Sequence, residues 1–85
     1  MPLIKSVKPY EDYKIAIELD NGHIIVLDME SKVDTIRFAR LWNKECFNKV
    51  HTDGYSVIWD KARVSMSITE IFQMLRTAYA YGMVG

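Results

Sequence analysis

The chain has 85 residues, and its 11 lysines and arginines are balanced by 11 aspartates and glutamates, so the formal net charge at pH 7 is zero. Apolar residues make up 49% of the sequence and charged residues 26%, which is ordinary globular usage and argues against intrinsic disorder. The balanced charge also argues against a nucleic-acid binder that depends on a broad basic face. The length predicts a single domain over residues 1–85.

The sequence predicts a cytoplasmic protein with no membrane segment. A single cysteine, Cys46, rules out an internal disulfide and fits a reducing compartment. The N-terminal stretch MPLIKSVKPY lacks the apolar core of a signal peptide. The longest aliphatic run, residues 24–27, is far too short to cross a bilayer.

The first third of the chain predicts a small antiparallel sheet. Residues 3–8 indicate a first strand that ends at Pro9, because proline cannot donate to a strand ladder. Residues 13–19 alternate between apolar and polar side chains, and residues 23–29 form a returning strand. Asn21-Gly22 between them predicts a two-residue type I′ hairpin turn, since both central positions of that turn need positive φ.

The two-residue turn fixes a register in which Leu19 faces Ile24 and Ile17 faces Val26. These four side chains then form the core face of the hairpin. The opposite face carries three apolar side chains, Ile25, Leu27 and Met29, together with Lys14 and Glu18. Three large apolar groups on a solvated face are unusual, so the sequence predicts that another element or a partner covers this second face.

The middle of the chain predicts two short helices followed by two strands. Asp34 or Ser31 is placed to cap a helix from about Thr35, with apolar side chains at residues 36, 38, 39, 41 and 42. Asn43 is placed to cap a second helix, in which Cys46 faces inward. Asp53-Gly54 predicts a turn before a strand at residues 55–59, and residues 63–66 predict a final strand.

A C-terminal helix over about residues 68–81 is the clearest prediction. Ser67 and Glu70 form a capping-box pattern, in which the serine accepts the amide three residues on and the glutamate reaches back to the serine amide. Apolar residues then recur at helical spacing up to Tyr79, and Gly82 is placed to end the helix. The predicted fold class is α+β, with an antiparallel sheet of about four to five short strands packed with two middle helices and this C-terminal helix.

The residue pattern predicts no enzyme, no metal site and no cofactor. His23 and Asp28 are better explained as parts of a hairpin than as a catalytic pair, because cross-strand polar pairs are common. Cys46, His51 and Asp53 lie close in sequence, but a thiol triad needs a base within hydrogen-bond reach, and Cys46 falls on an apolar helix face. Neither histidine has metal-ligand spacing with the cysteine.

The order and spacing of these features resemble a bacterial family called domain of unknown function 2442 (DUF2442), over about residues 3–73. The resemblance is carried by three stretches, VKPYEDYKIAIELDNGHIIVLDM, RFARLWNKECFNKVHTDGYSVIWD and VSMSITEIF. Within them the residues that match the family pattern most plainly, and that we expect to be structural, are Asn21, Gly22, Asp28, Trp59, Ser67 and Glu70. Ser65 departs from the family, which often has aspartate at this position.

The resemblance implies an α+β domain without established enzymatic activity. Members are often encoded beside a small protein of another family, which implies a protein-interaction module and an antitoxin-like half of a toxin–antitoxin-type pair. The expected partner is therefore a small toxin-like protein or a second copy of the chain, and the alternative is a nucleic-acid-binding regulator without a helix-turn-helix domain. The side chains expected at a partner interface are Ile25, Leu27, Met29, Trp42, Tyr79 and Tyr81.

Overall fold

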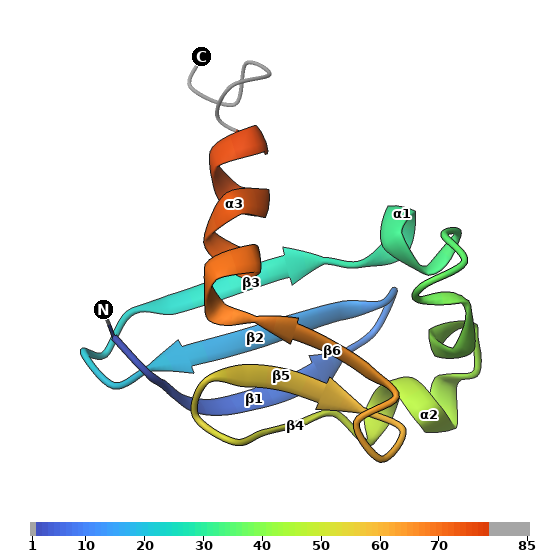
Figure 1. Cartoon of the computed structure of the whole chain (residues 1–85), viewed down its shortest axis with the longest axis horizontal. Helices are drawn as coiled ribbons and strands as arrows, with labels where there is room; N and C mark the ends of the chain where they lie inside the picture. The colour runs from blue at the N-terminus through green and yellow to red at the C-terminus, as the bar shows by residue number, and fades with distance from the viewer. Residues whose placement is uncertain (1, 79–85) are drawn as a thin grey trace.

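The computed structural model describes residues 2–78 of the chain. Strands occupy both the N-terminal and the C-terminal parts of the chain, and short helical pieces connect them (Figure 1). In chain order the elements are β1 (Ile4–Tyr10), β2 (Lys14–Leu19), β3 (Ile24–Asp28), α1 (Glu30–Val33), the 3₁₀ helix η1 (Ala39–Trp42), α2 (Lys44–Asn48), β4 (His51–Thr52), β5 (Ser56–Trp59), β6 (Val64–Ser67) and α3 (Ile68–Ala78).

The α+β class is confirmed, but the prediction of one sheet with four to five strands is wrong in detail. The strands within residues 2–78 form two three-stranded antiparallel sheets, ordered β1-β2-β3 and β4-β5-β6. The two sheets meet where β1 lies beside β4, and the amide of Ile4 donates to the carbonyl of Gly54 at 2.8 Å. The strand β1 also continues through Pro9, which pairs with Ile15, so Pro9 does not end it.

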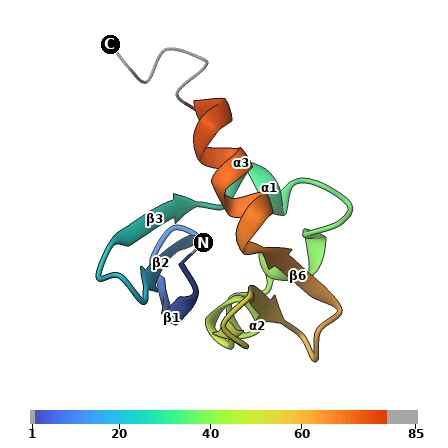
Figure 2. The ribbon, with the colours of Figure 1, turned by 60° about the vertical axis from the view of Figure 1, so that its left-hand side comes forward.

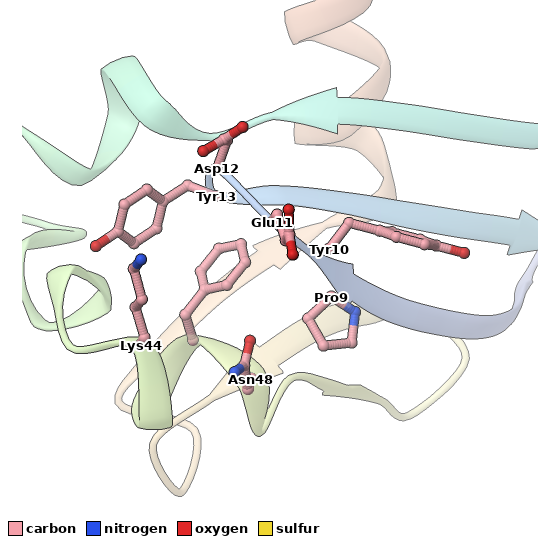
Figure 3. Close-up of a pocket in the computed structure, with 8 residues that line it drawn as sticks. Pro9, Tyr10, Glu11, Asp12, Tyr13, Lys44 and Asn48 are labelled. Carbon is pink, nitrogen blue, oxygen red and sulfur yellow. The ribbon is translucent and has the colours of Figure 1, made fainter.

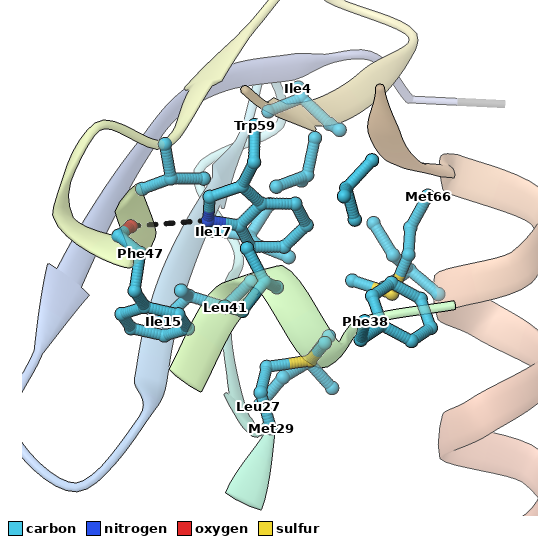
Figure 4. Close-up of a cluster of buried hydrophobic side chains, with 14 of the residues drawn as sticks. Ile4, Ile15, Ile17, Leu27, Met29, Phe38, Leu41, Phe47, Trp59 and Met66 are labelled. Atoms are coloured by element: carbon cyan, nitrogen blue, oxygen red, sulfur yellow. Dashed lines mark hydrogen bonds between the residues drawn. The ribbon is translucent and has the colours of Figure 1, made fainter. Parts of the chain in front are cut away.

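The core lies between the two sheets and is closed at one end by α1, η1 and α2 (Figures 1 and 4). Trp59 of β5 and Phe47 of α2 are both buried, and their rings stack with centroids 6.1 Å apart. The indole Nε1–H of Trp59 donates to the Phe47 carbonyl at 3.1 Å (Figure 4). This bond satisfies a polar group that burial would otherwise leave unpaired, so Trp59 is a core residue, as predicted.

The helix predicted from about Thr35 is wrong: a short helix, α1, lies in the predicted connection before it, and the predicted span holds only the 3₁₀ helix η1. The side chain of Asp28 accepts the amide of Glu30 at 2.9 Å, which starts α1 five residues before Thr35. The hydroxyl of Thr35 then donates to the Lys32 carbonyl at 2.6 Å, a local bond that competes with helix continuation. Ile36 is 98% exposed, so its predicted place on an inward helix face is wrong.

The second middle helix and the turn after it are confirmed. The side chain of Asn43 accepts the amide of Cys46 at 3.2 Å, which is the predicted cap of α2. Gly54 has a φ of +97°, and the carboxylate of Asp53 accepts the amides of Tyr55 and Ser56, each at 2.9 Å. These bonds build the predicted turn between β4 and β5 from local groups.

One of the two hydrogen bonds predicted for the capping box of α3 is confirmed. The hydroxyl of Ser67 accepts the amide of Glu70 at 3.1 Å, but the Glu70 carboxylate binds the guanidinium of Arg37 through both of its oxygens. The hydrogen-bonded Glu70 carboxylate raises the pKa of Arg37. Arg37 also donates to the carbonyl of Ser65. The segment after α1 is thereby tied to the start of α3.

Candidate interaction surface

The β2–β3 hairpin closes with a three-residue loop, so the predicted two-residue type I′ turn is wrong. The amide of Gly22 donates to the Leu19 carbonyl at 3.0 Å, and the amide of Leu19 donates to the His23 carbonyl at 2.8 Å. Gly22 has a φ of +89°, and the side chain of Asn21 accepts the amide of His23 at 3.0 Å. This arrangement is that of a type I turn followed by a left-handed residue, the commonest three-residue hairpin loop.

The extra loop residue moves the register by one position and exchanges the two faces of β3. Ile17 pairs with Ile25, and Ile15 pairs with Leu27. A one-residue slip turns every side chain of a strand to the other face of the sheet. Ile24 and Val26, predicted to lie in the core, are consequently 66% and 61% exposed.

The predicted second face is therefore part of the core. Leu27 is 5% exposed and Met29 is fully buried, and Ile25 is partly buried against the core cluster. The chain itself covers this face, which is one of the two alternatives that the sequence left open, and Leu27 and Met29 have almost no exposed surface for a partner. A charged residue at Leu27 would test core packing rather than binding.

The other predicted interface residues do not join this surface. Trp42 is 50% exposed at the end of η1, where its ring makes an edge-to-face contact with Tyr13 at a centroid distance of 5.4 Å. The Tyr13 hydroxyl donates to the Trp42 carbonyl at 2.7 Å, so this pair fastens η1 to the start of β2. Tyr79 and Tyr81 lie outside the described residues.

Two hydrogen bonds at the ends of the hairpin show which backbone groups β2 satisfies. The amide of Met29 donates to the carbonyl of Tyr13, and the amide of Leu19 donates to the carbonyl of His23, both at 2.8 Å. In an antiparallel ladder every second pair exchanges its hydrogen bonds, and the pairs between do not. The odd-numbered positions of the returning strand are therefore the ones bonded to β2.

The even-numbered positions of β3 face the other way. The alternation places Ile25 and Leu27 in hydrogen-bonded pairs with β2, and it points the N–H and C=O groups of Ile24, Val26 and Asp28 toward the outer edge of the sheet. β3 is an end strand of its sheet, and no strand among residues 2–78 pairs with that edge. The positions with outward backbone groups thus include the two with exposed apolar side chains.

Helix α3 follows directly after β6. In both views its C-terminal half projects beyond β3 (Figures 1 and 2). Ile68 and Ile71, near its start, are buried in the core, whereas Phe72 and Leu75 are only partly buried against it. The core therefore leaves part of the apolar side of the helix uncovered. Sequence periodicity predicts this apolar side, but the strand order that leaves part of it uncovered is not in the sequence pattern.

A hollow lies at the turn between β1 and β2. Its volume is about 550 Å³, and it is lined by Pro9, Tyr10, Glu11, Asp12, Tyr13, Lys44, Phe47 and Asn48 (Figure 3). Asp12 and Tyr13 have φ values of 60° and 59°, an uncommon conformation for residues with side chains. The lining mixes aromatic rings with two carboxylates and one lysine, and no group of three or more metal-ligating side chains gathers within residues 2–78.

The residues of the rejected thiol triad serve local structure. The carboxylate of Asp53 accepts two backbone amides, which lowers its pKa, with the bond from the Tyr55 amide as the largest cause. Nδ1 of His51 lies 3.4 Å from the carbonyl of Lys49. Among residues 2–78, no hydrogen bond links Cys46 to His51 through their side chains.

The fold is that of a small α+β domain in which the outer edge of β3 is exposed. The sequence matches the model of the family described as "Protein of unknown function (DUF2442)" over residues 4–75, so the chain belongs to the DUF2442 family. A search of curated proteins and a search of solved structures each returned no match. Within the described residues, no helix is both long and apolar enough to cross a membrane.

Proposed function

We propose that this domain is a protein-interaction module that binds an extended segment of its partner along β3. The observation that carries the proposal is the outer edge of β3, where outward backbone groups coincide with the exposed side chains of Ile24 and Val26. An end strand offers unpaired N–H and C=O groups to another chain, and strand addition is a recurrent mode of peptide recognition.

The contrast between the two end strands of this sheet supports the proposal. Natural edge strands are usually protected by lysine, proline or a bulge. β1 has these protections, with Lys5, Lys8, Pro9 and a register irregularity between Ile4 and Ser6. β3, with the sequence Ile-Ile-Val-Leu-Asp, has no lysine and no proline. An unprotected apolar edge is better suited to binding than to solvent.

The partner expected from the family resemblance is a small toxin-like protein, and this chain is then the antitoxin-like half of the pair, acting in the bacterial cytoplasm. The apolar character of β3 favours a protein partner over a nucleic acid, whose recognition depends on basic side chains.

The test is a comparison of three tagged chains: the wild type, V26K and the control Y55K. Tyr55 is 63% exposed, close to the 61% of Val26, but lies at the start of the other sheet. We expect V26K to weaken partner capture by at least about tenfold, as a central interface position does. Both variants should keep the wild-type unfolding midpoint in urea. Normal capture by V26K together with loss by Y55K would contradict the proposed surface.

A further inference from the structure

The edge of β3 ends beside a group of carboxylates. Asp28, Glu30 and Asp34 line a shallow hollow of about 460 Å³ together with Ser31. The ion pairs among residues 2–78 join other side chains: Lys5 to Glu18, Arg37 to Glu70 and Arg40 to Asp60. One oxygen of Asp28 accepts the Glu30 amide, and the other carboxylate oxygens of the hollow have no charged partner among these residues.

One cation, Lys14, lies opposite this group on β2. It pairs with Asp28 across the β2–β3 ladder, but it forms none of the ion pairs found among residues 2–78. The hollow is not a metal site either, because no group of three metal-ligating side chains in the described part of the chain is placed to hold an ion. The negative charge at this end of β3 is therefore available to a cationic side chain.

The remaining part of the edge is apolar. Ile24 and Val26 are exposed on the outer face of the sheet. In α3, Phe72 and Leu75 are only partly buried against the core. A strand added to β3 would cover Ile24 and Val26 on the outer face of the sheet, so its own side chains on that face would be apolar.

We propose that the partner of the surface described above is an extended apolar segment that adds to β3 antiparallel and begins with lysine or arginine. This inference rests on the proposed function. Both existing pairings in the sheet are antiparallel, and an antiparallel strand starts next to Asp28 and ends next to Ile24. The N-terminal end of the partner segment then lies beside Asp28, Glu30 and Asp34, where basic side chains meet opposite charge.

A second copy of the chain fits this surface less well. An antiparallel copy of β3 centred on Val26 would place its Ile24 opposite Asp28. That arrangement brings an aliphatic side chain, rather than a cation, to the carboxylates. The charge at the end of the edge therefore selects a different protein segment as the occupant.

The experiment uses three synthetic peptides and the full isotope-labelled chain. All three peptides contain the same stretch of alternating valine and threonine; one has a Lys-Lys pair at its N-terminal end, one has Lys-Lys at its C-terminal end and one has Glu-Glu at its N-terminal end. Binding is followed by the NMR shifts of the Ile24 and Val26 amides. We expect the first peptide to bind several-fold more tightly than the other two.

The variant D34N removes one carboxylate that makes no side-chain hydrogen bond among residues 2–78, and it leaves the bond between the Asp28 side chain and the Glu30 amide intact. We expect D34N to weaken the binding of the N-terminal Lys-Lys peptide by about threefold, and to leave the binding of the Glu-Glu peptide unchanged or slightly tighter. The preference of the wild-type chain for the N-terminal Lys-Lys peptide should also fall as the salt concentration is raised.

If the three peptides bind at the β3 amides with equal affinity, the inference that the partner segment begins with a basic residue is overturned, whereas the proposal that β3 binds an extended segment stands. Absence of any shift at Ile24 and Val26 with all three peptides would also overturn the inference. The proposed function is judged separately, by whether V26K loses the natural partner while Y55K retains it.

Discussion

The register of the β2–β3 hairpin makes a sharp prediction about two adjacent side chains. Leu27 is 5% exposed within the core, whereas Val26 is 61% exposed on the other face. Truncating a buried leucine to alanine costs about 3 kcal/mol, because both the transfer free energy and a cavity are lost. Truncating an exposed valine costs about 0.5 kcal/mol. L27A should therefore be the far more damaging of the two substitutions.

The difference is large for a chain of this size. An 85-residue domain has a free energy of unfolding of about 4–13 kcal/mol. With a urea m-value of about 1.5 kcal/mol per M, a loss of 3 kcal/mol lowers the midpoint by about 2 M, and a loss of 0.5 kcal/mol lowers it by about 0.3 M. Tryptophan fluorescence is a suitable signal, since Trp59 is fully buried.

The two possible registers predict opposite results. With the two-residue turn, Val26 would lie in the core and V26A would be the damaging substitution. A larger loss of stability for V26A than for L27A would therefore refute the three-residue loop and the outward position of Val26 on which the binding surface depends.

Three further predictions concern the stability of the domain. W59F should destabilise it by about 2 kcal/mol in urea unfolding, since it removes the hydrogen bond to the Phe47 carbonyl as well as ring volume in the core. A62G should raise the free energy of unfolding by up to about 1 kcal/mol, measured in urea. Ala62 is the last of three consecutive residues that have side chains and a positive φ, and its own φ is 68°. The folded state lowers the pKa of Asp53 from 3.8, so the ionised carboxylate stabilises the fold above about pH 4, and this contribution is lost as the pH falls through the lowered value. D53N should therefore show a shallower loss of stability than the wild type in acid unfolding curves, whereas an unchanged acid limb would contradict the role of the Asp53 turn.

Elements governed by local hydrogen bonds could be predicted from the sequence. Asn43 caps α2, Asp53-Gly54 forms its turn and Ser67 accepts the Glu70 amide at the start of α3, all through groups within three residues of one another. Such interactions depend on a few neighbouring residue types, which the sequence displays directly. The family membership follows from the same ordered set of local signals.

The candidate surface could not be predicted, because it depends on a choice between two turns. Asn21-Gly22 suits both a two-residue type I′ turn and a three-residue loop, since each needs a left-handed residue at Gly22. The pattern Ile-Ile-Val-Leu has apolar residues at consecutive positions, so it does not show which face is buried. The error in register reversed the assignment of Val26 and Leu27.

The start of α1 was also beyond sequence patterning. Asp28 is one of the residues that match the family pattern, but the sequence does not show that its side chain accepts the Glu30 amide. Ser31 and Asp34 are residue types that could start a helix equally well. The contact of Arg37 with Glu70 spans 33 positions of the chain and replaces the second bond of the capping box. Contacts of this kind depend on how elements pack, which a single sequence does not display.

Strand addition at β3 can be tested by amide hydrogen exchange along this strand, in the free chain and in the complex captured by the wild type. The account predicts fast exchange at Ile24 and Val26 in the free chain, because their amides point away from β2, and slow exchange at Ile25 and Leu27. In the complex the amides of Ile24 and Val26 should become protected. Unchanged fast exchange at these two positions in a complex that still forms would contradict strand addition at β3.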